Sequence, residues 1–313
     1  MNPFERALEL AERGRGKVED HPLVGAVVVR DDEVVGEGWY EYANVEHAEP
    51  IALRQAGERA RDATLYVTLE PCNHLGRTPP CSQAVIDAGI TRVVVGARDL
   101  NPKAAGGIET LRDAGIEVEL LDDRRAIVQN EAWRTWKALG RPFVTYKVAV
   151  SLDGRVVVPG RRWVSGEESR RRVHELRAAS DAVAVGMGTV RADKPRLDAR
   201  GVEAARQPRR LAFGHGESEL EVRSGPLADE LHALAADGVQ SLLLEGGPTL
   251  ATAFLRERLV DKLLLFVAPV LSGSGPRWVG DVAFALEHVN VVRSGEDVLV
   301  TAYPVFDVHR NRP

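Results

Sequence analysis

Short β-branched segments alternate with helical patterns in the first half of the chain, and this alternation constrains the fold more than any other feature of the sequence. Strands are predicted where valine, leucine and threonine cluster, and helices where apolar residues return every three or four positions. An alternating β–α–β–α–β order indicates a sheet with helices packed on its faces. The predicted strands lie at 63–69, 92–95 and 116–120, and the helices between them at 81–88 and 107–114.

The residues that precede this segment fit the same domain. The valine-rich stretch 24–38 is interrupted by two aspartates, which predicts a hairpin. Helical spacing returns at 47–56, where Pro50 is tolerated only in the first helical turn. His47 and Glu49 are therefore expected at the N-terminus of a helix.

The chain length predicts a second domain, because 313 residues exceed what one hydrophobic core usually supports. We assign residues 1–122 to the first domain, 123–141 to a charged linker helix and 142–313 to the second domain. Residues 201–230 are weakly patterned and carry no predicted element. The second domain is also α/β, with helices predicted at 169–179 and 249–257, and strands at 143–153, 182–185, 241–244 and, last, 262–268.

The charge distribution disfavours a nucleic-acid partner. The formal net charge is −5, and acids and bases are interspersed without a sustained basic face. No apolar run reaches the roughly 18 residues of a membrane-spanning helix, and the first residues lack the apolar core of a secretory signal. We therefore expect a cytoplasmic protein with no membrane partner.

The chain has only two cysteines, which are too few for a disulfide scaffold. Cys72 follows a predicted strand, and Cys81 comes after eight intervening residues. Together with His47 they supply two thiolates and one imidazole, and three is the number of protein ligands that a catalytic zinc uses. The fourth position is then left to a water molecule, whose pKa falls to about 7. His47, Cys72 and Cys81 are thus the predicted Zn²⁺ ligands.

Glu49 stands two residues after His47 and is the predicted proton carrier. Deamination needs a proton to leave the attacking water and another to reach the departing amine. A His-x-Glu motif followed by Pro-Cys is typical of zinc-dependent deaminases, which normally close it with a second cysteine after two residues rather than eight. The combination predicts a deaminase that acts on an aminopyrimidine-like ring, with Glu49 as the catalytic residue.

Glycines follow two predicted strands of the second domain, within 186–188 and 245–250. Backbone N–H groups of such turns can approach a pyrophosphate closely, although most glycine pairs serve only as turns. The domain has no G-x-G-x-x-G sequence, so a Rossmann dinucleotide site is not indicated. These patterns alone leave the cofactor of this domain open.

Residues 68–81 (TLEPCNHLGRTPPC) carry both cysteines in a loop that resembles the zinc loop of one particular family. That family is formed by the bifunctional pyrimidine deaminase and reductase enzymes of riboflavin biosynthesis. Similar stretches occur at 24–29, 99–102 and 143–154, so the resemblance covers nearly the whole chain. It implies a cytidine-deaminase-like three-layer α/β/α domain followed by a dihydrofolate-reductase-like α/β domain.

The resemblance implies two reactions on a phosphorylated pyrimidine. The first is hydrolytic removal of the ring 2-amino group of 2,5-diamino-6-ribosylamino-4(3H)-pyrimidinone 5′-phosphate. The second is reduction of the ribosyl side chain to ribityl with NADPH. His47, Cys72 and Cys81 match the family's zinc ligands, and Glu49 matches its acid/base. Homo-oligomerisation is also expected for the family.

The same resemblance implies binding residues in the second domain. Two arginines suit a ribose phosphate, because a guanidinium group binds phosphate oxygens in a bidentate manner, although a lone arginine more often forms a surface ion pair. Lys147 is a further candidate for contact with the sugar. The positions that match substrate contacts are Arg177, Leu197, Arg200 and Glu245, and those that match NADPH contacts are Ala149, Trp163, Thr189, Asp193, Gly246, Gly247, Pro248, Thr249 and Leu250.

Several residues differ from the family pattern. The family usually has a substrate-holding Asn where this chain has His21, and a His where it has Tyr40. Asn44 stands in place of a Gly, and Arg161 in place of a Ser. An alternative function is therefore deamination of a related aminopyrimidine, with a degenerate or repurposed reductase domain.

Two further classes of protein are considered. A tRNA adenosine deaminase shares the His-x-Glu zinc chemistry, but this chain has neither a basic stripe nor a closing C-x-x-C. A structural zinc site in a binding protein would need a fourth protein ligand, and His74 is near enough in sequence to serve.

Overall fold

The structure is a computed structural model, and it describes residues 2–15, 17–76, 78–204 and 206–306. Within these residues, no helix is long and apolar enough to cross a lipid bilayer.

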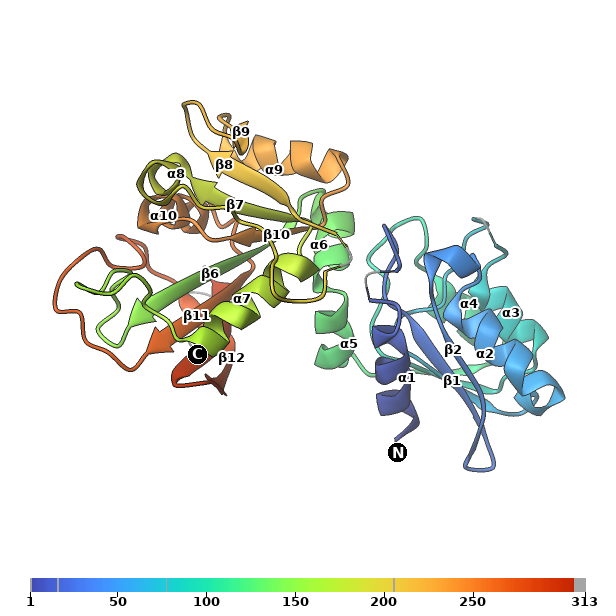
Figure 1. Ribbon diagram of the computed structural model, residues 1–313. Coiled ribbons are helices and arrows are strands. Elements are labelled where there is room, and N and C mark those ends of the chain that lie inside the picture. The colour runs from blue at the N-terminus through green and yellow to red at the C-terminus, as the bar shows by residue number, and fades with distance from the viewer. Residues whose placement is uncertain (1, 16, 77, 205, 307–313) are drawn as a thin grey trace, which may run out of the picture. The chain divides into compact units, whose positions relative to one another are not determined.

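The chain divides into two compact units, Met1–Leu139 and Gly140–Pro313, and each unit has its own sheet and its own hydrophobic core (Figure 1). The linker helix predicted at 123–141 corresponds to two helices, and both belong to the first unit. The last residues of the predicted second domain, 307–313, lie outside the described residues.

The first unit contains a five-stranded sheet in the order β2-β1-β3-β4-β5. Strand β1 pairs antiparallel with β2 and with the central strand β3, and β3, β4 and β5 run parallel. The predicted hairpin and the predicted strand and helix alternation are therefore confirmed. The strands are β1 (Gly25–Arg30), β2 (Glu33–Trp39), β3 (Thr64–Val67), β4 (Arg92–Val95) and β5 (Glu117–Leu120).

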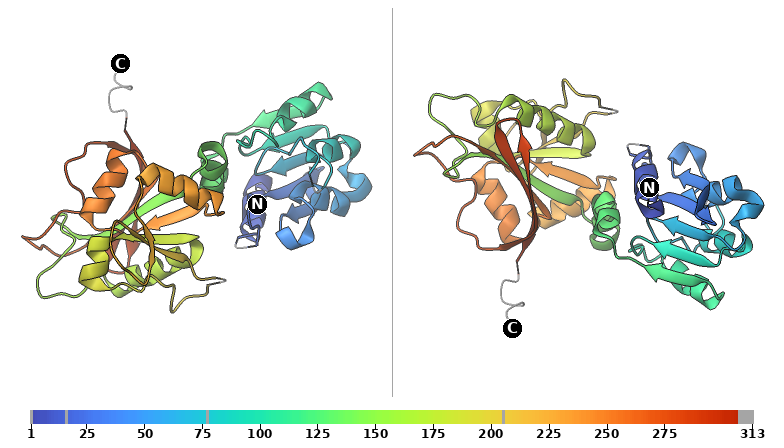
Figure 2. Two further views of the ribbon diagram at one scale, coloured as in Figure 1. Left: turned by 90° about the horizontal axis from the view of Figure 1, so that it is seen from above. Right: turned by 90° about the horizontal axis from the view of Figure 1, so that it is seen from below.

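Helices cover both faces of this sheet (Figure 2). Alternate side chains of a strand point to opposite faces, so Ala26 and Val28 pack in one cluster with α2, α3 and α4, while Val27 packs against α1. The predicted three-layer α/β/α domain is confirmed. Its helices are α1 (Pro3–Glu12), α2 (Ala48–Ala56), α3 (Cys81–Asp87), α4 (Gly107–Asp113), α5 (Arg124–Gln129) and α6 (Glu131–Leu139), with the short 3₁₀ helices η1 (Tyr42–Asn44) and η2 (Gly57–Ala60).

Helix α2 lies directly on strand β2 because two glycines of the strand have no side chain. A Cβ atom on Gly36 would come within 2.1 Å of the Ala52 carbonyl oxygen, and one on Gly38 within 2.2 Å of the Ala48 carbonyl oxygen. Such distances are far shorter than any van der Waals contact, so only glycine allows this packing. The glycines thereby allow the first two turns of α2 to lie against β2.

The second unit contains an eight-stranded sheet in the order β12-β13-β11-β6-β10-β7-β8-β9. Six strands from β11 to β9 run parallel, and β13 and β12 continue the sheet as an antiparallel hairpin. The strands are β6 (Phe143–Ser151), β7 (Ala182–Gly186), β8 (Arg209–Phe213), β9 (Glu221–Arg223), β10 (Ser241–Leu244), β11 (Lys262–Ala268), β12 (Ala285–Ser294) and β13 (Asp297–Val305).

Four helices occur in the part of the second unit that the structure describes. Leu231 of α9 and Phe254 of α10 pack in one cluster with the sheet, whereas Val173 of α7 packs with Leu264 and Phe266 in a separate cluster. The predicted α/β class is therefore confirmed for this unit as well. The helices are α7 (Glu167–Ala179), α8 (Met187–Asp193), α9 (Leu227–Ala236) and α10 (Pro248–Arg256).

Two sequence predictions for the second unit are wrong. The weakly patterned stretch 201–230 contains β8, β9 and the start of α9, and the strand at 262–268 is followed by two more. In β12 every residue except Ser294 is exposed, so its sequence has no alternation of buried and exposed positions that could reveal a strand. Backbone pairing with β13 defines it instead.

Candidate metal centre and reductase site

His47, Cys72 and Cys81 come together at the edge of the first sheet. His47 is the N-cap residue of α2, Cys72 lies in the loop after β3, and Cys81 is the first residue of α3. His47 Nδ1 lies 3.2 Å from Cys81 Sγ and 3.5 Å from Cys72 Sγ. One ligand atom from each residue lies within 4.8 Å of the others, so this group could hold a metal ion.

The donor set and its spacing fit zinc. Zn–N and Zn–S bonds of about 2.1 and 2.3 Å in a tetrahedral site separate nitrogen from sulfur by about 3.6 Å, close to the observed distances. A hydrogen bond from Cys81 lowers the pKa of the Cys72 thiol to about 4, which favours the ionised sulfur that binds a metal. Among the described residues, His74 is not part of the group, which disfavours the structural site closed by a fourth protein ligand.

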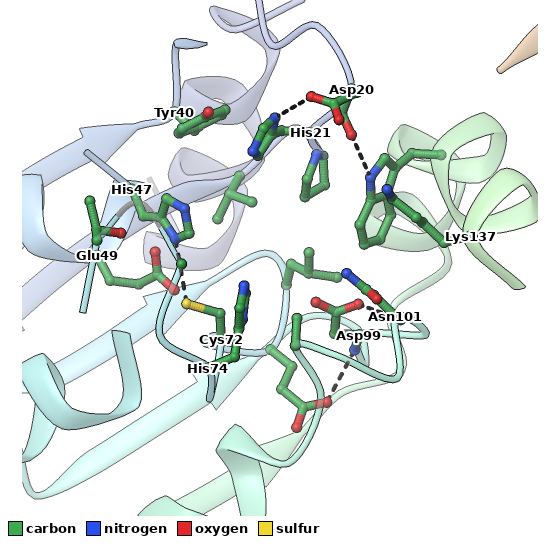
Figure 3. Close-up of a pocket in the computed structure, with 18 of the residues that line it drawn as sticks. Asp20, His21, Tyr40, His47, Glu49, Cys72, His74, Asp99, Asn101 and Lys137 are labelled. Atoms are coloured by element: carbon green, nitrogen blue, oxygen red, sulfur yellow. Dashed lines mark hydrogen bonds and ion pairs between the residues drawn. The ribbon is translucent and has the colours of Figure 1, made fainter. Parts of the chain in front are cut away.

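The Glu49 carboxyl group lies beside this cluster. It follows His47 in the first turn of α2, and its side chain points toward His47 and Cys72 in Figure 3. The residue is only 3% exposed, and burial raises the pKa of Glu49 to about 7. A carboxyl group in this range can both accept and donate a proton near neutral pH.

A second buried carboxylate, Glu70, holds the loop that surrounds the cluster. Its Oε1 accepts hydrogen bonds from Gly106 N and Ile108 N at the start of α4, and its Oε2 accepts one from Asp99 N. No sequence pattern predicts this role. The sequence does place an acidic residue directly before Pro71 and Cys72, after a predicted strand. A charged side chain is rarely buried unless it has partners, so this position could have indicated a structural role.

A cavity lined by His47, Cys72 and Glu49 also includes His21 and Tyr40, two of the residues that depart from the family pattern (Figure 3). His21 Nδ1 lies 2.8 Å from the Asp20 carboxylate, and its ring lies 5.2 Å from that of Tyr40. Tyr40 in turn meets His47 edge-on at 5.4 Å. Both substitutions therefore lie next to the metal cluster. The side chain of Asn44 lies outside the described residues, as does Arg77 of the zinc loop.

Helix α6, which the sequence predicts only as a linker, supplies a further part of the cavity wall. Trp133 is buried, and its Nε1 donates a hydrogen bond to the Asp20 carbonyl oxygen at 3.2 Å. Asn130, between α5 and α6, exchanges two hydrogen bonds with the backbone of Leu23. These contacts fix α6 against the segment that carries His21.

In the second unit, three predicted substrate residues form a buried ionic cluster. Glu245 Oε2 lies 3.2 Å from Lys147 Nζ, and Glu245 Oε1 lies 2.6 Å from Arg177 Nε. Burial by itself would raise the pKa of Glu245, but the charges and hydrogen bonds of Lys147 and Arg177 have a larger, opposite effect. The pKa of Glu245 therefore lies below its ordinary value, and the carboxyl group is ionised. The cluster joins the centre of β6 and the residue directly after β10 to α7.

The two other predicted substrate residues lie on the segment that Arg177 also contacts. Arg177 Nη1 donates to the Asp198 carbonyl oxygen, and Arg200 pairs with the Asp198 carboxylate. Leu197 is buried with a φ of 55°, a left-handed conformation that a leucine adopts only when its surroundings enforce it. Asp198, which is not among the predicted site residues, links Arg177 to Arg200.

The two predicted glycine loops lie side by side in the second unit. Strands β7 and β10 are parallel neighbours, so the loops that follow them meet at one edge of the sheet. A Cβ on Gly247 would lie 3.4 Å from Thr189 Oγ1, and one on Gly186 would lie 3.5 Å from Leu250 Cβ. Pro248 and Thr249 begin α10 there. N–H groups at the start of a helix suit a pyrophosphate, so these loops could hold the phosphates of a cofactor.

The remaining predicted cofactor residues lie elsewhere in the unit. Trp163 is 51% exposed in the loop between β6 and α7, and Arg162 and Arg170 lie over its ring. Asp193 is exposed at the end of α8, and Ala149 packs within the cluster under α7. Arg161, the departure noted in this loop, is exposed.

A zinc-binding deaminase joined to a reductase is the class of protein that this fold and these two sites define. Residues 2–97 match the family model of the cytidine and deoxycytidylate deaminase zinc-binding region. Residues 142–300 match the model of the RibD C-terminal domain. The chain therefore belongs to the RibD family of riboflavin biosynthesis proteins.

Individual relatives extend this result over nearly the full chain. The Aquifex aeolicus riboflavin biosynthesis protein RibD is 38% identical, with 96% of this chain and 97% of that protein covered. The structure of Acinetobacter baumannii RibD is similar with a TM-score of 0.82 at 35% identity, and 97% of this chain and 98% of that one are covered. A Thermotoga maritima deaminase/reductase structure has the same TM-score and coverage at 34% identity.

The predicted identity is thus confirmed. The protein is a bifunctional riboflavin biosynthesis enzyme, with a zinc-dependent deaminase activity and an NADPH-dependent reductase activity. Its cofactors are Zn²⁺ and NADPH. Because the relatives match both halves of the chain, a repurposed reductase domain is not favoured.

Proposed function

We propose that the first unit deaminates 2,5-diamino-6-ribosylamino-4(3H)-pyrimidinone 5′-phosphate and that the second reduces the ribosyl group of the product with NADPH. The observation that carries this proposal is the convergence of His47, Cys72 and Cys81 beside the buried Glu49. The Thermotoga maritima relative is named as a deaminase and reductase of these compounds, which supports the same assignment here.

In the deaminase site, His47, Cys72 and Cys81 would hold the zinc ion, which would supply an activated water nucleophile near neutral pH when bound. The Glu49 carboxylate is the group that accepts a proton from the attacking water. It then donates a proton to the amino group that leaves as ammonia. Burial of Glu49 supports this role because both protonation states are accessible near pH 7. The cavity wall orients the ring above the cluster.

In the reductase site, NADPH supplies a hydride, and the protein positions donor and acceptor. We assign the NADPH contacts to the two glycine loops with Thr189, and to Ala149, Trp163 and Asp193. Glu245 holds Lys147 and Arg177 in fixed positions, so that Lys147 contacts the sugar. Arg200 is half-exposed and binds the phosphate of the substrate. The buried Leu197 shapes the turn that leads to Arg200.

The organisation of the whole protein is part of the proposal. We infer a deaminase domain at 1–122, a connecting helical segment at 123–141 and a reductase domain at 142–313. We further infer a homo-oligomer that works in the cytoplasm on small molecules, without a nucleic-acid or membrane partner, in keeping with the net charge of −5 and its even distribution.

The test uses the purified holoenzyme. The diaminopyrimidine phosphate is added first without NADPH and then with it, and ammonia release and NADPH oxidation are followed separately. We expect ammonia in the first stage and NADPH oxidation only in the second. Zinc chelation is expected to abolish the first reaction while NADPH oxidation with pre-deaminated substrate continues. Deamination that survives complete removal of zinc would contradict the proposal.

A further inference from the structure

The deaminase cavity contains an excess of acidic groups. Four carboxyl side chains line it, and Asp20, Glu49 and Asp99 are among them. A substrate that carries a phosphate dianion therefore enters a cavity of like charge, which disfavours binding unless a cation is present. Among the described residues that line the cavity, Lys137 is the sole lysine or arginine.

Lys137 occupies the end of the cavity that is remote from the metal cluster. In Figure 3 it projects from α6 on one side, while His47 and Glu49 lie on the opposite side. Its Nζ lies 3.9 Å from the centre of the Trp136 ring, a cation–π contact that restricts the position of the ammonium group. The contacts of Trp133 and Asn130 described above hold the helix in place.

We propose that Lys137 binds the 5′-phosphate of the pyrimidine substrate in the deaminase site. This inference rests on the proposed function, because it assumes that the ring to be deaminated lies at His47 and Glu49. The sugar phosphate then extends from the ring toward the other end of the cavity, where Lys137 lies. An ammonium group is a compact charge that suits a phosphate monoester.

The inference changes the role of helix α6. The sequence predicts it as a charged connection between domains, yet it supplies one wall of the deaminase cavity and, among the described lining residues, its one lysine. Lys137 contributes to specificity rather than to chemistry, because it lies away from the reacting atoms. Its removal should therefore weaken substrate binding and leave the chemical step unchanged.

The experiment compares Lys137→Gln, Lys137→Arg and the unchanged holoenzyme on the diaminopyrimidine substrate with and without its 5′-phosphate. Lys17→Gln is the matched control, since Lys17 is exposed, pairs with Glu41 and does not line the cavity. We expect Lys137→Gln to raise the KM of deamination about tenfold for the phosphorylated substrate, with kcat within about twofold. The KM of Lys137→Gln for the dephosphorylated substrate should stay unchanged. The KM of Lys137→Arg for the phosphorylated substrate should be close to that of the unchanged enzyme.

The reductase activity of the same chain serves as the folding control and should be equal in all variants. An unchanged KM in Lys137→Gln, while the unchanged enzyme deaminates normally, would overturn this inference and leave the proposed function intact. An equal rise in KM for both substrates would overturn it too. The inference would also be overturned if Arg77→Gln raised the KM for the phosphorylated substrate alone and Lys137→Gln did not. Failure of the unchanged holoenzyme to deaminate either substrate would instead refute the proposed function itself.

Discussion

Replacement of Glu245 by glutamine removes the one negative charge from a buried cluster with two cations. The side chains of Lys147, Arg177 and Glu245 are 14%, 13% and 8% exposed. At the observed distances of 3.2 and 2.6 Å, an effective dielectric constant of about 20 gives attractions of roughly 5 and 6 kcal/mol before the cost of desolvation. Breaking a buried ion pair by removal of one partner costs about 3–5 kcal/mol, because an uncompensated charge remains. We expect Glu245→Gln to lower the free energy of unfolding of the second domain by this amount.

Differential scanning calorimetry can isolate the effect. A two-domain chain unfolds in more than one step, and NADPH raises the transition of the domain that binds it, which identifies that step. The second-domain transition of Glu245→Gln should fall, while the zinc-dependent transition of the first domain should not move. The reductase activity should be lost and the deaminase activity retained.

The pH dependence gives an independent check. The folded pKa of Glu245 lies below its ordinary value, so its stabilising contribution is complete above about pH 4.3, the pKa of an unperturbed glutamate. It is lost as the pH falls through the lower folded pKa. The difference in stability between the unchanged protein and Glu245→Gln should therefore be constant near neutrality and shrink only below pH 4.

A second variant, Lys147→Met, distinguishes the loss of the charge that balances two cations from the loss of one contact in the cluster. Lys147→Met leaves Arg177 and Glu245 as a neutral, hydrogen-bonded pair, so we expect a smaller loss of about 1–2 kcal/mol. A loss below about 1 kcal/mol for Glu245→Gln, or a larger loss for Lys147→Met, would refute the reasoning that Glu245 balances two buried cations.

Two further predictions concern the loops around the metal cluster. Glu70→Gln places an amide N–H₂ group where a carboxylate oxygen now accepts a backbone N–H. We therefore expect the free energy of unfolding of the first domain to fall by about 2–3 kcal/mol, and the deaminase kcat/KM to fall as well. A free energy of unfolding in urea within about 0.5 kcal/mol of that of the unchanged protein would contradict this expectation. Gly107→Ala adds a Cβ atom that would lie 1.8 Å from the Pro71 carbonyl oxygen, which must displace the adjacent Cys72. We expect weaker zinc binding in a chelator competition, and unchanged affinity would show that the loop can absorb the methyl group.

The first domain could be predicted well from sequence because its signals are local. The hairpin, the buried parallel strands and the position of His47 at a helix start each depend on a few neighbouring residues. The metal ligands could be proposed for the same reason, since a His-x-Glu pair and two cysteines are rare enough to indicate one site. Their convergence in space then follows from the fold.

Other features could not be predicted because they depend on partners far apart in the chain. Glu245 meets Lys147 and Arg177 from three separate elements, and no local pattern indicates that they share one buried cluster. The contribution of α6 to the cavity was missed because charged helices most often face solvent. Strand β12 was missed because its exposed residues carry no periodicity, and only its pairing with β13 defines it.

The most direct test of the account is the zinc content of the purified protein and of Glu49→Gln, measured together with both activities. If three side chains hold the metal and Glu49 only moves protons, both proteins should contain one zinc per chain. Deamination should fall by about 10²–10⁴ in Glu49→Gln, while NADPH oxidation on the deaminated substrate stays unchanged. A variant that still deaminates at the normal rate, or a normal enzyme that contains no zinc, would contradict the central claim.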